Sequence, residues 1–290
     1  MELTQATIVV TGAGSGIGAA LCERFAKQRP RAIALVDQDA ASVERVCAKL
    51  AGIFPEVEFS SYQVDVTNET EIIQLVNTIT TSIGVIDLFC GNAGIGTALG
   101  IEAPDEVWQR TLEVNVMAHV YATRALMPIW LDRGRGYYLL TASAAGLLSN
   151  LGDAPYSVSK HGAVALAEWL AITYGDRGIG ISCLCPQGVR TPLLFPEMKT
   201  SRDSSDSGGS GNSDAGQSGP DSDAVALAVV RAQRILEPAE VAESVIAALA
   251  SEQFLILPHE EVTAYEQARA TDRERWLRSM RRLQAQISGE

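Results

Sequence analysis

Short, uninterrupted apolar segments alternate with helix-like segments along most of this 290-residue chain. This alternation limits the possible folds more than any other feature. An apolar segment without polar alternation is typical of a strand that is buried on both faces, and such strands occur in parallel sheets covered by helices. Because crossovers between parallel strands are right-handed, the helices are divided between the two faces. The sequence therefore predicts an α/β fold, a doubly wound parallel sheet with helices on both faces.

The alternation continues almost to the end of the chain. Strands are expected at 7–10, 32–36, 58–64, 86–90, 137–141, 179–184 and 254–257. Helices are expected at 19–28, 42–51, 69–82, 106–129, 156–174 and 238–249, with an amphipathic, charge-rich tail helix at 264–286. The elements after residue 223 are too few for a second core, so residues 1–290 are expected to form a single domain.

One segment interrupts the pattern. In residues 200–223, 18 of the 24 residues are Ser, Gly or Asp. Such a segment cannot bury enough apolar surface to offset the entropy lost when it becomes ordered. We expect residues 200–223 to be a flexible insertion within the domain.

Composition excludes several classes of function. The formal net charge of −12 makes nucleic acid an unexpected partner, because an acidic surface repels phosphate. No apolar run reaches the ~18 residues of a membrane span, and no basic region precedes an apolar core near the start, so neither a membrane partner nor a signal peptide is expected. The five cysteines lack CxxC spacing, which indicates core thiols in a reducing compartment and predicts a cytoplasmic location. The three histidines lack ligand spacing, so no metal is expected and surface or interface positions are predicted for them.

A glycine-rich segment, TGAGSGIG at 11–18, joins the first expected strand to the first expected helix. Glycines at such a turn allow the backbone to approach a pyrophosphate, and the helix N-terminus favours its negative charge. A tight structural turn is the alternative interpretation. Asp37 follows the second strand, where a carboxylate can accept hydrogen bonds from the adenosine ribose and repel a 2′-phosphate. That position favours NAD over NADP, unless Asp37 is only a solvated loop residue.

Tyr156 and Lys160 are four residues apart and therefore lie on one face of the expected helix at 156–174. A nearby ammonium stabilises a phenolate and lowers the tyrosine pKa, which a tyrosine needs in order to act as a base near neutral pH. Taken alone, a YxxxK pattern also fits an exposed pair with no role.

Together these motifs resemble the classical short-chain dehydrogenase/reductase family, whose members have a Rossmann-type fold. The resemblance is close over about residues 5–195. The matching positions, in chain order, are 11–18, Asp37, Asp65, Val66, Asn92, Ala93, Gly94, Asn115, Ser143, Tyr156, Lys160 and 186–191. Each motif alone is weak, whereas the complete set in this order is specific.

The resemblance implies roles for these residues. Tyr156 would be the general acid/base, Lys160 would lower its pKa and hold the nicotinamide ribose, and Ser143 would bind the substrate oxygen. Asn115 would hold a water that connects Lys160 to solvent. The implied cofactor-binding set is Gly12, Ser15, Gly16, Ile17, Gly18, Asp37, Asp65, Val66, Asn92, Ala93, Gly94, Tyr156, Lys160, Pro186, Gly188, Val189 and Thr191. The activity implied is hydride transfer between NAD and a secondary alcohol or ketone.

Two positions depart from the family pattern. Gly91 replaces the first of two asparagines that often precede Ala-Gly, and little effect is expected. Gln187 separates Pro186 from Gly188, where the family often has Pro-Gly, so Gln187 is expected to place an amide near the nicotinamide or the substrate. That insertion puts close copying of the family's pocket geometry in doubt.

Apolar side chains on both sides of the expected site suggest an apolar substrate. They are Leu147, Leu148, Leu151, Leu193, Leu194, Phe195 and Met198. These residues could equally pack the lid to the body or face a second subunit. The long helices at 106–129 and 156–174 resemble those that form four-helix interfaces in the family, so a homodimer or homotetramer is expected. Two alternative functions stay open: an NADPH-dependent ketone reductase, and a non-catalytic dinucleotide sensor in which the acidic insertion binds a protein partner.

Overall fold

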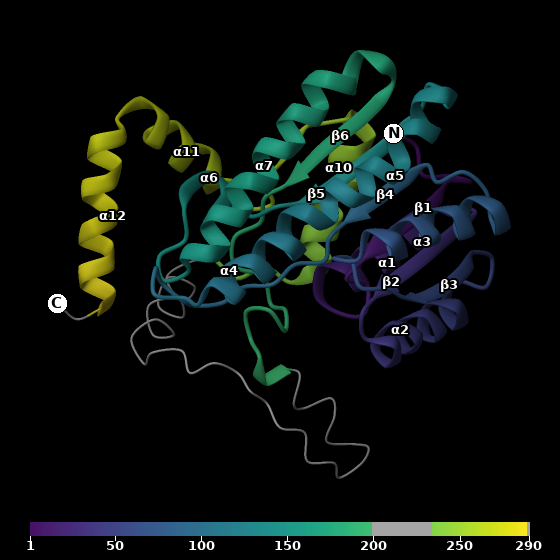
Figure 1. Cartoon of the computed structure of the whole chain (residues 1–290), viewed down its shortest axis with the longest axis horizontal. Coiled ribbons are helices and arrows are strands. Elements are labelled where there is room, and N and C mark those ends of the chain that lie inside the picture. The colour runs from purple at the N-terminus through teal and green to yellow at the C-terminus, as the bar shows by residue number, and fades with distance from the viewer. Residues whose placement is uncertain (199–233, 289–290) are drawn as a thin grey trace, which may run out of the picture.

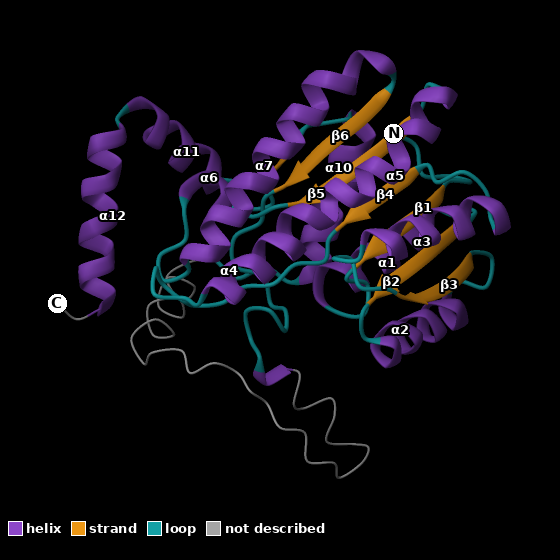
Figure 2. Ribbon diagram, viewed as in Figure 1, coloured by secondary structure: helices purple, strands orange, loops and turns teal. Residues whose placement is uncertain are grey.

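The computed structural model describes residues 1–198 and 234–288, and the predicted insertion at 200–223 lies outside them. Seven parallel strands form one sheet in the order β3-β2-β1-β4-β5-β6-β7 (Figure 2). The strands are β1 (Thr7–Thr11), β2 (Ala32–Asp37), β3 (Glu58–Gln63), β4 (Leu88–Gly91), β5 (Gly136–Thr141), β6 (Ile179–Leu184) and β7 (Leu255–Ile256). The strand order reverses beside β1, because β2 and β3 lie on one side of it and β4 to β7 on the other. The predicted doubly wound sheet is therefore confirmed.

The helices cover both faces of the sheet (Figure 1). The larger ones are α1 (Gly16–Ala26), α2 (Ala40–Ile53), α3 (Glu69–Ser82), α4 (Asp105–Leu112), α5 (Ala118–Arg133), α7 (Ala154–Tyr174), α10 (Pro238–Ser251), α11 (Glu261–Thr271) and α12 (Arg273–Ser288). Shorter turns are η1 (Glu113–Met117), α6 (Ala145–Leu148) and η2 (Gly175–Arg177). No helix in the described part of the chain is long and apolar enough to cross a membrane.

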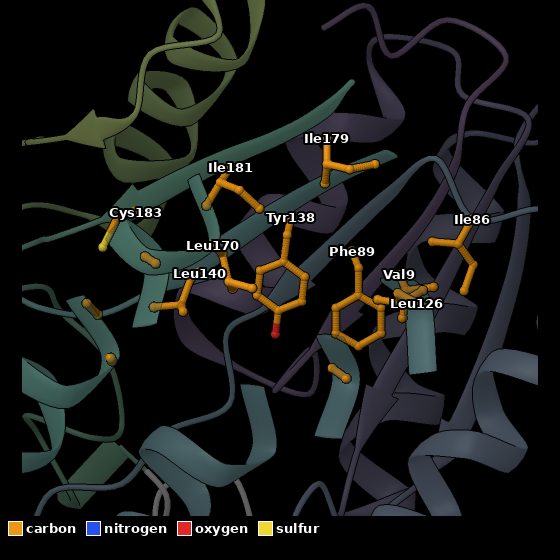
Figure 3. Close-up of a cluster of buried hydrophobic side chains, with 14 of the residues drawn as sticks. Val9, Ile86, Phe89, Leu126, Tyr138, Leu140, Leu170, Ile179, Ile181 and Cys183 are labelled. Carbon is orange, nitrogen blue, oxygen red and sulfur yellow. The ribbon is translucent and has the colours of Figure 1, made fainter. Parts of the chain in front are cut away.

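Successive strand residues point to opposite faces, and each face has its own core. Val9 packs in the core beneath α3, α5 and α7, whereas its neighbour Val10 packs beneath α1, α2 and α10. In the first of these cores the rings of Phe89 and Tyr138 stack with centroids 5.6 Å apart (Figure 3). Continuous burial along β1 and β5 explains why the strands read as unbroken apolar runs.

Two of the expected helices differ from the prediction. The helix expected at 106–129 is interrupted by η1, a π-helical turn centred on Asn115, and α5 then continues to Arg133. The expected tail helix at 264–286 is two helices, because Asp272 leaves helical geometry and its carboxylate accepts the backbone N–H of Arg275 at 2.9 Å. Both deviations are local hydrogen-bonding events that hydrophobic periodicity does not register.

The prediction for the histidines is wrong for two of the three. His119 is only 2% exposed, its Nδ1 lies 3.0 Å from the Tyr138 hydroxyl, and burial lowers the pKa of His119 to about 3. His259 is also 2% exposed; its Nδ1 accepts the backbone N–H of Gln187, and its Nε2 donates to the carbonyl of Arg234. Protein groups contact both ring nitrogens of His259, whereas Nε2 of His119 is buried without a hydrogen-bond partner among the described residues.

Candidate active site

A cleft of about 1820 Å³ lies along the carboxyl ends of the strands. Parallel sheets bind ligands at this edge, at the point where the strand order reverses. Most residues expected in the site line this cleft, and its lining includes Gly12, Ser15, Gly16, Ile17, Asp37, Asp65, Val66, Asn92, Ala93, Gly94, Ser143, Tyr156, Lys160, Pro186, Gln187, Gly188, Val189 and Thr191. Two expected residues, Gly18 and Asn115, do not line it. The fold thus brings distant segments of the sequence to one surface.

The glycine-rich turn between β1 and α1 has the geometry of an anion-binding turn. Gly12 and Gly16 have φ values of +65° and +52°, a region in which residues with a Cβ are strained. No side chain caps α1 at Ser15, so the first N–H groups of this helix are open to a ligand. Gly18 has a different role, because a Cβ there would collide with the carbonyl of Gly12. Gly18 therefore permits α1 to pack against the turn.

Thr11 holds the floor of the cleft in place. Its hydroxyl accepts the backbone N–H groups of Asn92 and Ala93, at 2.9 and 3.1 Å. The Asn92 amide in turn donates to the Thr11 carbonyl at 3.0 Å. These contacts join the ends of β1 and β4, and they explain why a threonine precedes the glycines.

Two aspartates lie at the carboxyl ends of β2 and β3: Asp37 is the last residue of β2, and Asp65 lies two residues after β3. The Asp37 carboxylate accepts the backbone N–H of Gly14 at 2.9 Å and that of Asp39 at 3.1 Å. Asp65 accepts the N–H and hydroxyl of Thr67 and lies 3.6 Å from the Arg110 guanidinium. Partial burial opposes ionisation of Asp65, but these hydrogen bonds and the guanidinium outweigh it and lower its pKa.

Tyr156, Lys160 and Ser143 line the same cleft as the glycine-rich turn. Lys160 is buried; its Nζ lies 5.6 Å from the centroid of the Tyr156 ring and donates to the Thr141 carbonyl at 3.0 Å. The Ser143 hydroxyl accepts the backbone N–H of Ala145 at 3.1 Å. A Cβ on Gly94 would lie 3.3 Å from Lys160 Nζ, so a side chain at this position would crowd the lysine.

The ionisation of Tyr156 differs from the expectation that Lys160 lowers its pKa. Part of Tyr156 is exposed in the cleft, yet the surrounding protein desolvates the hydroxyl and raises its pKa to about 12. The Ser143 hydroxyl acts in the opposite direction, and the Asp153 carboxylate adds to the rise. Burial also lowers the pKa of Lys160 to about 8, and at neutral pH most of this lysine still carries its positive charge.

The side-chain amide of Asn115 connects two segments of the chain by hydrogen bonds. Its amide nitrogen donates to the Ile95 carbonyl at 2.9 Å and to the Ser159 hydroxyl at 3.0 Å, while its oxygen accepts the Ile95 N–H at 3.0 Å. Both side-chain donors are therefore engaged, and they connect the loop after β4 to α7. The π-helical turn places this fully buried amide between the two segments.

Asp153 is an important residue of this region that sequence reasoning missed. It is buried, caps α7 by accepting the N–H of Tyr156 at 3.1 Å, and also accepts the N–H groups of Thr97 and Ala98, each at 2.8 Å. The sequence did contain a signal, because aspartate one residue before Ala-Pro is typical of a helix N-cap. Asp153 fixes the loop after β4 against the first turn of α7.

The segment after β6 forms another wall of the cleft. Val189 pairs with Leu236 in a parallel bridge, and Thr191 touches the position where Gly16 would carry a Cβ. The side-chain oxygen of Gln187 is buried and has no hydrogen-bond partner among the described residues. An orphaned acceptor at the wall of a cleft is the kind of group that a ligand N–H satisfies.

The expected apolar wall is only partly present. Leu148, Leu151, Leu193, Leu194 and Met198 line the cleft. Leu147 instead packs in the core and is 6% exposed. The Phe195 ring lies beneath the Arg190 guanidinium, whose carbon is 5.4 Å from the centroid of the ring. The short helix α6 turns Leu147 inward. From the sequence, no helix is expected between the strand at 137–141 and the helix at 156–174. The cleft lining also includes Tyr265, Trp276, Met280 and Leu283 from α11 and α12, which sequence reasoning did not place there.

The comparisons agree with this geometry. The family model described as "short chain dehydrogenase" matches residues 6–201. The chain belongs to the short-chain dehydrogenase family. It is therefore an oxidoreductase that uses a dinucleotide cofactor and acts on hydroxyl groups.

Two relatives within the short-chain dehydrogenase family are named as dehydrogenases of hydroxylated compounds. The chain is 36% identical over 198 residues to 1-deoxy-11-beta-hydroxypentalenate dehydrogenase of Streptomyces exfoliatus, which covers 67% of this chain and 71% of the relative. It is 31% identical over 196 residues to 3beta-hydroxysteroid dehydrogenase 2 of Eggerthella lenta, with coverage of 66% and 74%.

A solved structure extends the likeness to nearly the whole chain. The short-chain dehydrogenase/reductase of Burkholderia phymatum in complex with NAD superposes with a TM-score of 0.81 at 29% identity, covering 94% of this chain and 96% of that one. Other structures that share the fold contain NADPH. The comparisons therefore show the fold and the family. Because structures with this fold contain NAD or NADPH, the comparisons do not distinguish the two dinucleotides for this chain.

Proposed function

We propose that this protein is an NAD-dependent dehydrogenase that transfers a hydride between the nicotinamide and an apolar secondary alcohol or its ketone. The observation that carries the proposal is one cleft lined by the glycine-rich turn, Asp37, Ser143, Tyr156 and Lys160. A dinucleotide that binds along the turn has one end near Asp37 and the other near Tyr156.

The residues present fit a dinucleotide. The open N-terminus of α1 and the positive φ values of Gly12 and Gly16 suit a pyrophosphate. The orphaned Gln187 oxygen suits the N–H group of a carboxamide, with Thr191 and Val189 beside it. Asp65 and Val66 line the part of the cleft that would hold the adenine.

Two carboxylates support NAD over NADP. Asp37, the last residue of β2, lines the cleft, and Asp39 lines it two residues further on. The hydrogen bond from Ser42 holds the pKa of Asp39 below its usual value. A ribose 2′-phosphate would lie near both negative charges, while Gln38 and Ser15 offer no cation to balance it. Arg45 also lines this region, but its guanidinium donates to the Ser42 hydroxyl at 3.1 Å.

The chain's own groups would then handle the proton. A nicotinamide held in this cleft would supply or accept the hydride. Ser143 donates a hydrogen bond to the substrate oxygen and stabilises charge that develops there. Tyr156 removes the hydroxyl proton as a phenolate in oxidation and returns it as a phenol in reduction. Lys160 provides positive charge beside the phenol and binds ribose hydroxyls. Asn115 connects the loop after β4 to α7, the helix that carries Tyr156 and Lys160.

We further propose a homodimer or homotetramer. Val158, Trp169 and Ile172 lie along one face of α7 and are 51%, 56% and 84% exposed. Leu112 of α4 is 37% exposed, and α4 packs beside α7. Apolar residues gathered on neighbouring helices mark an interaction surface. We also propose a cytoplasmic location, because the five cysteines lack CxxC spacing and four of them are buried as expected of core thiols.

The deciding experiment is a titration of the purified protein with NADH and with NADPH, followed by nicotinamide fluorescence. We expect saturable NADH binding and much weaker NADPH binding, then NAD-dependent oxidation of a secondary alcohol that Tyr156→Phe removes without loss of NADH binding. Failure to bind either dinucleotide would show that the glycine-rich turn is only structural. Unchanged turnover in Tyr156→Phe would refute the assigned role of that residue.

A further inference from the structure

The C-terminal helices form an arm beside the cleft. Val262 at the start of α11 is fully buried in the core, and α11 packs against α6. The arm then turns at Asp272, and α12 stands apart from the sheet (Figure 1). The rings of Tyr265 and Trp276, with centroids 6.4 Å apart, connect the two helices. Both helices lie outside the residues matched by the family model, so family membership assigns them no role.

One face of α12 is apolar and faces the cleft. Trp276, Met280 and Leu283 follow one another at spacings of four and three residues, which places them on one stripe of the helix. All three are only half-buried, and all three line the same cleft as Ser143 and Tyr156. The exposed positions of α12 carry the arginines, namely Arg273, Arg275, Arg278, Arg281 and Arg282. The helix thus presents its apolar side to the cavity and its charged side to solvent.

The cleft extends beyond the residues expected to hold the dinucleotide, because its lining also includes residues of α11 and α12. Small-molecule sites usually have volumes of about 300–1,000 Å³, whereas this cleft measures about 1820 Å³. The cofactor residues occupy the side between α1 and Ser143, which leaves the space between Tyr156 and α12. A half-buried tryptophan and leucine beside this space remain in contact with water until an apolar group covers them.

The charges on this side of the cleft are already balanced. Arg190 is paired with Glu237 at 2.7 Å, and the Asp153 carboxylate accepts four hydrogen bonds from Thr97, Ala98 and Tyr156. The α12 arginines are not among the residues that line the cleft in the described part of the chain. Among the described residues, a ligand group in this region therefore meets apolar surface and no unpaired charge.

We propose that Tyr265, Trp276, Met280 and Leu283 form a distal apolar subsite that binds the uncharged end of the substrate remote from the reacting carbon. The substrate is accordingly an extended apolar secondary alcohol or ketone. This inference rests on the proposed function, because Tyr156 defines the reacting end of the cleft.

A pair of ligands that differ only in length tests the subsite. With NAD as cofactor, the wild-type protein should oxidise 2-undecanol with a higher kcat/KM than 2-butanol. Trp276→Ala should lower kcat/KM for 2-undecanol by about tenfold, which corresponds to ~1.4 kcal/mol, and leave the value for 2-butanol unchanged. Trp276→Phe should restore most of the preference. Leu277→Ala is the matched control, because Leu277 is the next residue on α12, is 42% exposed and does not line the cleft.

A binding measurement separates the subsite from catalysis. Saturable binding of 2-undecanone, followed by tryptophan fluorescence, should exceed that of 2-butanone, and its signal should vanish in Trp276→Phe but persist in Trp169→Phe. Equal binding of the two ketones, or equal losses for both alcohols in Trp276→Ala, would overturn the subsite. A change of oligomer size in Trp276→Ala would also overturn it, since a second copy would then cover the stripe. Preferential 2-undecanone binding without any turnover would instead refute the proposed function and keep the subsite.

Discussion

The Asp153 carboxylate accepts the backbone N–H of Tyr156 at 3.1 Å in the first turn of α7. The same side chain binds Thr97 through both its N–H and its hydroxyl, at 2.8 and 2.6 Å. One buried acid thus fixes the helix that carries the proposed general acid/base and the loop that faces it. Its negative charge also contributes to the raised pKa of Tyr156, because it disfavours a phenolate nearby.

Asp153→Asn should shift the pH profile of the reaction to lower pH. The folded-state pKa of Tyr156 is raised to about 12, and loss of a negative charge beside it lowers that value. Oxidation needs the phenolate, so the rise of kcat/KM with pH should begin earlier; reduction needs the phenol, so its alkaline decline should also begin earlier. The measurement is kcat/KM against pH in both directions. Thr97→Val is the control, because it removes a hydrogen bond to Asp153 and keeps the charge; the same shift in both variants would contradict the charge argument.

Asp37→Ala should weaken NADH binding and relax discrimination against NADPH. A hydrogen bond to a charged group contributes about 1.5–3 kcal/mol, so the Kd for NADH should rise by roughly 10- to 100-fold. The Kd for NADPH should fall, because the carboxylate no longer repels the 2′-phosphate. Fluorescence titration measures both values. Asp39→Ser keeps a capping residue on α2 and should leave NADH binding close to wild type; an unchanged preference in Asp37→Ala would remove the basis for assigning NAD.

The sequence was sufficient for the sheet and for most of the cleft lining. Strands such as β1 and β5 are buried along their whole length, so their composition reveals them directly. The carboxyl ends of parallel strands share one edge, so motifs after different strands must converge there. Ordering of Tyr156 and Lys160 on one helix face followed from their spacing alone.

Features that depend on distant contacts were not predictable in this way. The Asn115 amide bonds to Ile95 and Ser159, which are 20 and 44 residues away in the chain, and the π-helical turn η1 places it between them. The pKa of Tyr156 depends on how deeply the fold desolvates the hydroxyl, which spacing to Lys160 does not report. The position of Trp276 at the cleft depends on the turn at Asp272 and on the packing of α11 against α6.

Gly18→Ala should destabilise the fold and weaken NADH binding together. The added Cβ would collide with the carbonyl of Gly12, which is backbone and cannot move without shifting the turn. Overpacking of this kind lowers the free energy of unfolding by about 1–3 kcal/mol. Gly52→Ala is the matched control, because a Cβ at this position meets nothing within 4 Å. The substitution also replaces a glycine inside helix α2 with alanine. It should raise stability by about 0.5–1 kcal/mol. Urea unfolding measures both variants, and equal effects would show that the turn tolerates a side chain.

Ile172→Glu should dissociate the proposed oligomer. Ile172 is 84% exposed on the face of α7 that also carries Trp169 and Val158. Burial of an isoleucine side chain contributes about 1.5–3 kcal/mol, and a buried unpaired carboxylate adds a desolvation penalty, so the dissociation constant should rise by at least about tenfold. Light scattering during gel filtration measures the mass across a dilution series. Ile101→Glu is the control, because Ile101 is 83% exposed in the loop before α4 and lies off the α7 face. A mass that is unchanged by Ile172→Glu, or changed equally by Ile101→Glu, would show that this face of α7 is not the interface.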